Sequence, residues 1–379
     1  MDFTLDREHK LAQELFRSFA ETEVAPFAQD FDAESRFPEE LVKQMQSYGF
    51  MGIPFAKEYG GQGCDVLTYI LCVEEMAKAC GSTATIVSAH TSLCADLINK
   101  YANEEQKKKY LTPLANGEKL GAFALTEADA GTDAGAQNTH AVLDGDEWVL
   151  NGSKIFITNA SKADIYIVIA KTNPDLGSRG LSAFIVEKGT PGLSFGPLEK
   201  KMGIHASATG EVIMIDCRIP KENLIGKENG GFKIALGTLD GGRIGIAAVA
   251  LGIAQGALDK AVAYVKERKQ FGRPIAKFQN TQFKLAEMAT EVDAARYLVY
   301  RAAIAKDKGE NYGIYAAMAK LKASEVASWV AAASVQLHGG YGYMQDYDVE
   351  RMMRDAKITE IYEGTSEVMR MVIGGNILG

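Results

Sequence analysis

The hydrophobic period of the chain changes twice, and this change constrains the fold more than any other feature. From residue 5 to about 115, apolar residues recur at helix spacing, as at Leu11 and Leu15. Around Gly121 the period becomes two, which is typical of strands, and after Gly231 it returns to helix spacing. The predicted order is therefore helices, sheet, helices.

These changes divide the chain into three predicted domains: a helical domain of residues 1–118, a β-domain of residues 119–228 and a helical bundle of residues 229–379. No helix-length crossover separates the predicted strands, so we expect a largely antiparallel sheet, a barrel or a sandwich. Residues 144–146 and 151–152 are typical of tight turns between strands. The bundle is expected to contain long helices at residues 234–268, 279–308, 312–338 and 349–361.

Composition restricts the partners that the chain can have. The net charge is −8 without a basic block, which argues against nucleic acid or an anionic membrane surface. The five cysteines form no CxxC and the five histidines are scattered, so neither a disulfide framework nor a metal site is predicted. The amino terminus is too charged for a secretory signal, and the most apolar run, residues 244–254, is about half the length that spans a bilayer. We expect a soluble, cytoplasmic protein without membrane insertion.

A helical pattern breaks at Glu363 and Gly364 and restarts at once. Gly364 can take a positive φ, Thr365 suits an N-cap, and Glu367 then falls in a first turn that favours negative charge. Glu363 is therefore expected on a rigid bend beside Tyr362. A carboxylate in such an apolar setting can have a raised pKa and act as a general base, whereas the alternative is a solvated loop acid.

Common nucleotide-binding motifs are not found, because the glycine pairs lack the third glycine of a Rossmann fingerprint and the Lys-Ser/Thr of a P-loop. The best remaining candidate is the segment 123–133, whose hydroxyls and small residues offer donors and close backbone approach to an anion. An ordinary junction loop is the alternative. Arg243, in a segment 239–243 expected at the start of a long helix, offers a fixed donor near the Glu363 bend or else a salt bridge at the helix start.

Together these segments resemble the acyl-CoA dehydrogenase family. Residues 361–365, Ile-Tyr-Glu-Gly-Thr, are similar to the signature in which this glutamate removes the α-proton of an acyl-CoA while the β-hydrogen leaves as hydride to flavin N5. The resemblance covers essentially all 379 residues and is closest to the short-chain, or butyryl-CoA, branch. It implies FAD as the cofactor and an α+β multidomain fold with an amino-terminal helical domain, a central β-domain and a carboxy-terminal four-helix bundle.

Two segments resemble the flavin motifs of this family. Residues 123–133 are similar to L-T-E-P-x-A-G-S/T-D, although Ala128 replaces the proline and leaves the loop less rigid. Residues 156–159 are similar to W/F-I-T-N, in which the aromatic lies beside the ring and the threonine near N5. The resemblance implies flavin contacts at Phe123, Leu125, Thr126, Phe156, Ile157 and Thr158, and pyrophosphate contacts at Gly131 and Thr132.

Two further segments resemble the parts of the family that reach the FAD of a neighbouring subunit. Residues 268–272 are similar to R-x-x-F-G, and residues 336–340 to Q-x-x-G-G, which cradles the adenosine diphosphate. A homotetramer is therefore implied. The contacts implied at this shared site are Arg268, Gln270, Phe271, Gln279, Gln336, Gly339 and Gly340. Further FAD contacts are implied at Thr365 and Glu367, and substrate contacts at Thr132, Asp240, Arg243, Tyr362 and Gly364.

The implied reaction is the α,β-dehydrogenation of a short-chain acyl-CoA to a trans-2-enoyl-CoA, with electrons passing to electron-transferring flavoprotein. In some relatives the base is an acidic residue just before the arginine, but this chain has Gly242 there, which favours Glu363 as the base. Three alternatives stay open: an enoyl-CoA reductase acting on crotonyl-, acryloyl- or aryl-enoyl-CoA, an acyl-CoA oxidase that uses O2, and a non-catalytic flavin-binding scaffold.

Overall fold

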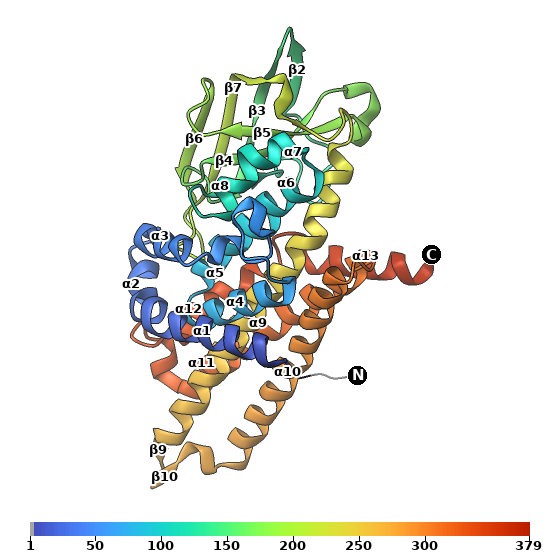
Figure 1. The fold of residues 1–379 in the computed structure, drawn as a ribbon. Helices are drawn as coiled ribbons and strands as arrows, with labels where there is room; N and C mark the ends of the chain where they lie inside the picture. The colour runs from blue at the N-terminus through green and yellow to red at the C-terminus, as the bar shows by residue number, and fades with distance from the viewer. Residues whose placement is uncertain (1–3) are drawn as a thin grey trace.

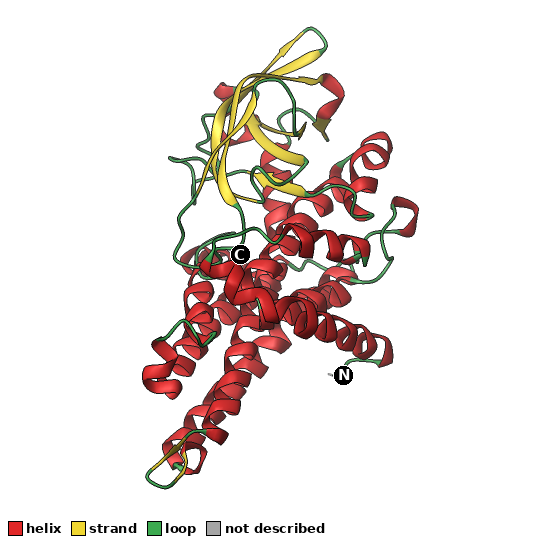
Figure 2. Cartoon of the chain, turned by 90° about the vertical axis from the view of Figure 1, so that its left-hand side faces the viewer, coloured by secondary structure: helices red, strands yellow, loops and turns green. Residues whose placement is uncertain are grey.

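The computed structural model describes residues 4–379, and its parts follow the predicted order of helices, sheet and helices (Figure 1). The sheet forms one end of the molecule, and the long carboxy-terminal helices extend to the other end (Figure 2). The predicted α+β fold is therefore confirmed. Helix α9 (Gly231–Glu267) runs from the sheet into the helical body, so it connects the two regions that carry the predicted site.

The amino-terminal part is helical. Three of its helix starts have the side-chain caps that their sequences favour. The Asp6 carboxylate accepts a hydrogen bond from the His9 N–H at 2.9 Å, the Asp65 carboxylate accepts one from the Thr68 N–H at 2.8 Å, and the Asn103 side chain accepts one from the Gln106 N–H at 2.9 Å. The helices are α1 (Arg7–Phe19), α2 (Ala28–Ala33), α3 (Glu39–Ser47), α4 (Val66–Ala79), α5 (Gly81–Ser88), α6 (Asp96–Tyr101), α7 (Glu104–Gln106) and α8 (Thr112–Ala115).

The central sheet has the strand order β6-β7-β3-β2-β4-β5-β8, with β1 beside β4. Most neighbours are antiparallel as expected, but β1 runs parallel to β4, so the sheet is mixed. Parallel pairing is possible because the β2–β3 hairpin lies between these two strands in the chain and gives it room to return in the same direction. The strands are β1 (Gly121–Ala124), β2 (His140–Asp144), β3 (Glu147–Thr158), β4 (Ile165–Lys171), β5 (Leu181–Glu187), β6 (Leu193–Leu198), β7 (Thr209–Pro220) and β8 (Leu224–Ile225).

One predicted turn is wrong. Strand β3 runs unbroken through Asn151 and Gly152, where its register against β7 shifts. Gly152 has φ +142°, and a Cβ there would lie 2.5 Å from Thr139 Oγ1. This glycine therefore serves a β-bulge and a close contact between strands. The other predicted turn, around Gly145, is present because Asp144 pairs with Glu147 across it.

The carboxy-terminal part consists of long helices and one short hairpin. The segment 239–243 lies inside α9 and not at its start, because the helix already begins at Gly231, which packs against the backbone of Ser182 with no room for a side chain. The remaining elements are β9 (Lys269–Gln270), β10 (Arg273–Pro274), α10 (Gln279–Asp307), α11 (Gly313–His338), α12 (Val349–Ile358) and α13 (Ser366–Leu378).

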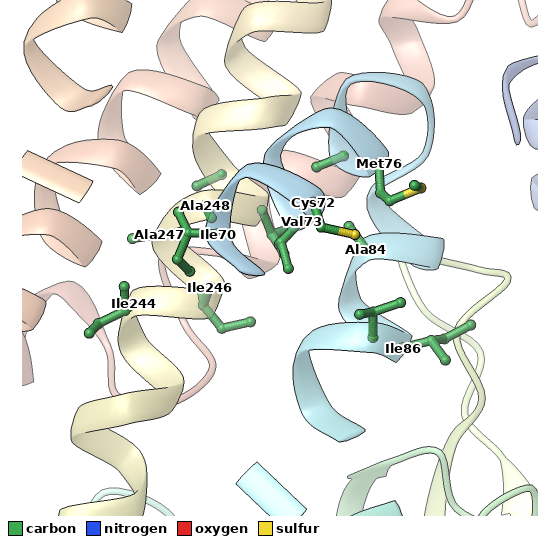
Figure 3. Packing of buried hydrophobic residues seen from close by; sticks show 14 of the residues in the cluster. Ile70, Cys72, Val73, Met76, Ala84, Ile86, Ile244, Ile246, Ala247 and Ala248 are labelled. Atoms are coloured by element: carbon green, nitrogen blue, oxygen red, sulfur yellow. The ribbon is translucent and has the colours of Figure 1, made fainter. Parts of the chain in front are cut away.

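Helix α9 is the centre of the helical core. Figure 3 shows Ile244 and Ile246 of this helix near Ile70 and Val73 of α4. A Cβ at Gly252 would overlap the Glu74 carbonyl oxygen, so this glycine lets α4 and α9 approach closely. By length and composition α9 qualifies to cross a membrane, yet 78% of its apolar window is buried inside the protein, as in the core helix of a globular domain.

Candidate active site

The bend predicted at Glu363 and Gly364 is present between α12 and α13. Glu363 has φ +53° and Gly364 has φ +106°, so both lie in the left-handed region, which is uncommon for a glutamate. The Thr365 hydroxyl accepts a hydrogen bond from the Val368 N–H at 3.4 Å and caps α13. Such backbone strain is typical of functional sites, because the surroundings must hold it.

The Glu363 carboxylate lies over a glycine of α9. A Cβ at Gly242 would overlap its Oε2 atom and come within 2.5 Å of Leu93 Cδ2. Within residues 4–379, the buried Oε2 atom has no hydrogen-bond partner. Burial raises the pKa of Glu363 to about 8, because desolvation disfavours the charged carboxylate more than the nearby Arg243 and Lys320 favour it. The raised pKa expected from the sequence is therefore present.

Two cations hold the bend through its backbone. The Arg243 guanidinium donates from Nε to the Glu363 carbonyl at 3.2 Å and from Nη1 to Asp240 Oδ1 at 2.8 Å. The Lys320 ammonium donates to the Gly364 carbonyl at 2.6 Å. Burial lowers the pKa of Lys320 to about 8, although the Glu363 carboxylate acts against this shift. Arg243 is thus near the bend, as the sequence predicted, and it is bound to its main chain.

The other residues predicted around the bend differ in exposure. The Tyr362 hydroxyl is buried, and no acceptor or donor in the described chain meets it. Burial raises the pKa of Tyr362 above its ordinary value, so this phenol stays neutral. Glu367 lies exposed in the first turn of α13, where the pKa of its carboxyl is lowered by a hydrogen bond from its own backbone N–H and then by the Thr365 side chain. Asp240 forms an ion pair with Arg243, which in turn contacts the bend.

The structure brings the two segments with flavin-motif resemblance together. The side chain of Phe123, in β1, is buried in the core. The side chain of Leu125, which directly follows β1, is also buried. The Ile155 N–H of β3 donates to the Thr126 carbonyl at 2.8 Å, which joins the first segment to the second. Thr126 and Thr158 are both half-buried, and neither hydroxyl has a partner among residues 4–379, so both are available to a ligand.

The second segment exposes an aromatic ring from a strained backbone. Phe156 has φ +58° and is 61% exposed, whereas Ile157 beside it is buried. The Asn159 side chain donates to the carbonyls of Gly121 at 3.1 Å and of Ile86 at 3.3 Å, which fixes the end of β3 against β1 and α5. An exposed ring on a fixed strand end is suited to stacking against a planar ligand.

Gly131 and Thr132 lie on the exposed loop that follows β1. A Cβ at Gly131 would meet nothing within 4 Å, so the backbone here is open to a large group. This openness agrees with the close approach of an anion that the sequence predicted.

The remaining predicted cofactor residues lie at the opposite end of the molecule, around the β9–β10 hairpin (Figure 1). A pocket of about 520 Å³ there is lined by residues that include Arg268, Gln270, Gln336, Gly339 and Gly340. Phe271 at the hairpin tip is 94% exposed, and Gln279 begins α10 on the surface outside this pocket. One subunit therefore does not bring these residues to Thr126 and Thr158.

Comparison with known proteins decides the family. Models described as the acyl-CoA dehydrogenase amino-terminal, middle and carboxy-terminal domains match residues 6–118, 122–217 and 229–378. A short-chain specific acyl-CoA dehydrogenase of Clostridium acetobutylicum is 60% identical over 100% of both chains. This chain belongs to the acyl-CoA dehydrogenase family. It is an oxidoreductase of the class that acts on CH–CH groups, and FAD is the cofactor that this membership indicates.

Other similar members of the acyl-CoA dehydrogenase family carry descriptions of different activities. The acryloyl-CoA reductase (NADH) of Anaerotignum propionicum is 51% identical over 100% of this chain and 96% of its own. The solved butyryl-CoA dehydrogenase of Megasphaera elsdenii matches with TM-score 0.99 and 51% identity over both full chains. A chain in a structure described as electron transferring flavoprotein of Acidaminococcus fermentans matches with TM-score 0.99 and 55% identity, again over both full chains.

The residues of this family member fit FAD. The free hydroxyls of Thr126 and Thr158, the open backbone at Gly131 and the exposed ring of Phe156 provide donors, space and a stacking surface in two segments that the bond from Ile155 to Thr126 joins. When bound, FAD supplies a two-electron acceptor at this place.

Lys320 is a site residue that was not predicted from the sequence. Its side chain is fully buried in α11, next to the bend that carries Glu363. The signal was present in the helical spacing, because Lys320 lies four residues after Ala316 and three before Ala323, which are both buried. A lysine on such a face must be paired, since an unpaired buried charge is costly.

Proposed function

We propose that the chain catalyses the α,β-dehydrogenation of a short-chain, butyryl-like acyl-CoA to a trans-2-enoyl-CoA and passes the electrons to electron-transferring flavoprotein. The observation that carries the proposal is the Glu363 carboxylate, whose Oε2 atom is buried without a hydrogen-bond partner in the described chain and whose pKa is raised by burial to about 8. The relatives described as short-chain specific and butyryl-CoA dehydrogenases support the acyl group, and the Acidaminococcus structure supports the acceptor.

The proposed chemistry follows from the acidity of the substrate. The α-C–H of a thioester is a weak acid, so a base must lie beside it while donors polarise the carbonyl. The Glu363 carboxylate takes the α-proton, and the Glu363 N–H, which meets no acceptor within residues 4–379, is free to donate to the thioester oxygen. The segments that carry Thr126 and Thr158 would hold FAD, which would supply the acceptor for the β-hydrogen. Arg243 and Lys320 keep both Glu363 groups in place by holding the carbonyls of the bend.

The same residues also suit an enoyl-CoA reductase, which the similarity to the acryloyl-CoA reductase favours as a second candidate. A carboxyl with a pKa of about 8 is largely protonated at neutral pH. Protonated Glu363 then gives its proton to the α-carbon of an enoyl-CoA. A base that titrates near neutrality serves either direction.

Anaerobic bleaching of the flavin by saturated acyl-CoAs of increasing length tests the proposed substrate. We expect kcat/KM for reduction to be highest near four carbons, so that butyryl-CoA exceeds octanoyl-CoA. A higher kcat/KM for octanoyl-CoA, or for a branched or aromatic acyl group, would show that the acyl group is wrong. No bleaching by any saturated acyl-CoA, with bleaching reversed by crotonyl- or acryloyl-CoA after chemical reduction, would favour the reductase.

We also propose a cytoplasmic homotetramer in which the hairpin at Arg268 and the loop at Gln336 complete the FAD site of a neighbour. The support is geometric: Phe271 is 94% exposed at the tip of the β9–β10 hairpin, and this hairpin and the central sheet lie at opposite ends of the subunit (Figure 1). A site completed by a second chain links assembly to cofactor binding.

Phe271→Ser is therefore expected to lower FAD occupancy on dilution without unfolding the subunit, because the ring makes few contacts within its own chain. Light scattering coupled to gel filtration, with absorbance at 450 nm, measures mass and flavin together. Tyr343→Ser is a matched control, since Tyr343 is 81% exposed and lies outside the residues that line the pocket. A monomer that retains full FAD at low concentration contradicts the shared site.

A further inference from the structure

A buried ammonium lies under the proposed flavin loop. Lys154 of β3 is 0% exposed, and its Nζ donates to the Leu125 carbonyl at 3.1 Å, to Glu127 Oε1 at 2.7 Å and to Gln137 Oε1 at 2.8 Å. All three N–H bonds of the ammonium are used. Lys154 therefore connects strand β3 to both ends of the loop that follows β1.

Glu127, at the start of this loop (residues 125–139), binds the backbone at its end. Its carboxylate accepts hydrogen bonds from the Asn138 N–H at 2.6 Å and the Thr139 N–H at 3.0 Å. Gln137 donates from its side-chain amide to the Ala134 carbonyl at 3.0 Å. The intervening residues carry the exposed Gly131 and Thr132, so the network fixes the base of the loop and leaves its tip free.

Three consecutive residues of the loop, 125 to 127, are each held by a separate hydrogen bond from β3. Lys154 holds the Leu125 carbonyl, the Ile155 N–H holds the Thr126 carbonyl, and Lys154 again holds the Glu127 side chain. Strand β3 continues from these residues to Thr158, the other threonine of the proposed flavin site. The two threonines are thus positioned from one strand.

A buried ion pair is weak evidence for stability, because the desolvation of both charges offsets their attraction. Burial lowers the pKa of Lys154 to about 8 even though the Glu127 carboxylate lies against it. An apolar pair of the same volume would fill this space without that cost. What the ionic network adds is a set of directed bonds to particular carbonyls and N–H groups, and these determine the shape of the loop.

We propose that Lys154 is a positioning residue for the flavin, which sets the backbone of residues 125–127 and the base of the loop so that Thr126, Gly131 and Thr132 are arranged before FAD binds. The inference rests on the FAD site of the proposed function and names the residue that forms it. A pre-organised loop lowers the entropy lost when the cofactor binds.

The decisive variant is Lys154→Met combined with Glu127→Gln in the full chain. Lys154→Met alone leaves the buried Glu127 charge without its cation, and such a protein is expected to lose thermal stability. The double variant removes both charges and is expected to recover most of this stability in the apoprotein. The glutamine keeps one acceptor oxygen, which can serve the Asn138 N–H or the Thr139 N–H but not both, because Glu127 uses Oε2 for the first and Oε1 for the second. We expect the double variant still to bind FAD at least tenfold more weakly than wild type and to show a broadened flavin absorption band.

FAD affinity is measured by titrating apoprotein with FAD and following flavin fluorescence, and stability by the thermal unfolding of the same apoprotein. Lys162→Met is the control, because Lys162 of the β-domain forms a solvent-accessible ion pair with Glu39 of α3, and FAD affinity should be unchanged in this variant. A stable double variant whose FAD affinity and spectrum match wild type overturns the positioning role. Failure of wild-type apoprotein to bind FAD at all would instead contradict the proposed function.

Discussion

Replacing Glu363 by glutamine is expected to leave FAD and acyl-CoA binding nearly intact and to slow flavin reduction by at least about 10²–10⁴-fold, the usual contribution of a general base. Glutamine keeps the shape of the side chain and the backbone N–H of the bend, but it cannot take a proton. The position just before Arg243, where some relatives carry an acidic base, is Gly242 in this chain, so no second base is expected from that position.

Stopped-flow reduction by butyryl-CoA measures the chemical step, and equilibrium titration of the oxidised enzyme with an enoyl-CoA measures binding separately. Glu310→Gln is a control, because Glu310 is an exposed acid between α10 and α11 and is not among the residues predicted to contact FAD or substrate. Reduction of Glu363→Gln within a few fold of wild type would remove Glu363 from the proton transfer. Glu360, whose carboxylate is bonded by Lys357 and Ser328, would then be the next acid to test.

The pH profile provides an independent check on the same residue. The base must be ionised, and its pKa is raised to about 8, so the reduction rate should rise with pH and level off above about pH 8. Below that value the ionised fraction falls roughly tenfold for each pH unit. A profile that is flat from pH 6 to 9 would show that the carboxylate is solvated as an ordinary loop acid, the alternative that the sequence alone left open.

The broad fold was predictable because hydrophobic period is a local property. The change near Gly121 and the return near Gly231 were visible in the chain, and so were the bend and N-cap at Thr365. The parallel pairing of β1 with β4 was not predictable, since it depends on where the chain goes after leaving a strand. The supposed turn at Gly152 failed for a related reason: the same glycine serves a turn or a bulge, and only the neighbouring strand decides.

The candidate site was predictable where its residues follow one another in the chain, and less so where they meet through packing. Glu363 and Thr158 each lie in a recognisable local segment. Lys154 and Lys320 lie in ordinary strand and helix patterns, and their importance comes from partners that are distant in sequence, such as Leu125 and the Gly364 carbonyl. Single buried lysines at apolar positions are therefore the signal to seek in such a sequence.

Gly242→Ala is expected to lower kcat for flavin reduction by about 10²-fold, because displacing a reacting group by about 1 Å can cost that much. The new Cβ would overlap Glu363 Oε2 and crowd Leu93 Cδ2 at 2.5 Å. The end of the glutamate side chain can rotate away more easily than the packed helix α9 can move, so the carboxylate should leave its place. Alanine is a better helix former than glycine, so propensity does not oppose the substitution.

FAD content and thermal unfolding should change little in Gly242→Ala, since the crowded atoms belong to the bend and to Leu93 and not to the proposed flavin segments. Gly374→Ala is the control: Gly374 lies in α13, where a Cβ would meet nothing within 4 Å, and its kcat should match wild type. Loss of FAD in Gly242→Ala would mean that the strain spreads beyond the bend. An unchanged kcat would show that the carboxylate reaches the α-proton from a second rotamer, and that its position over Gly242 is not the one that reacts.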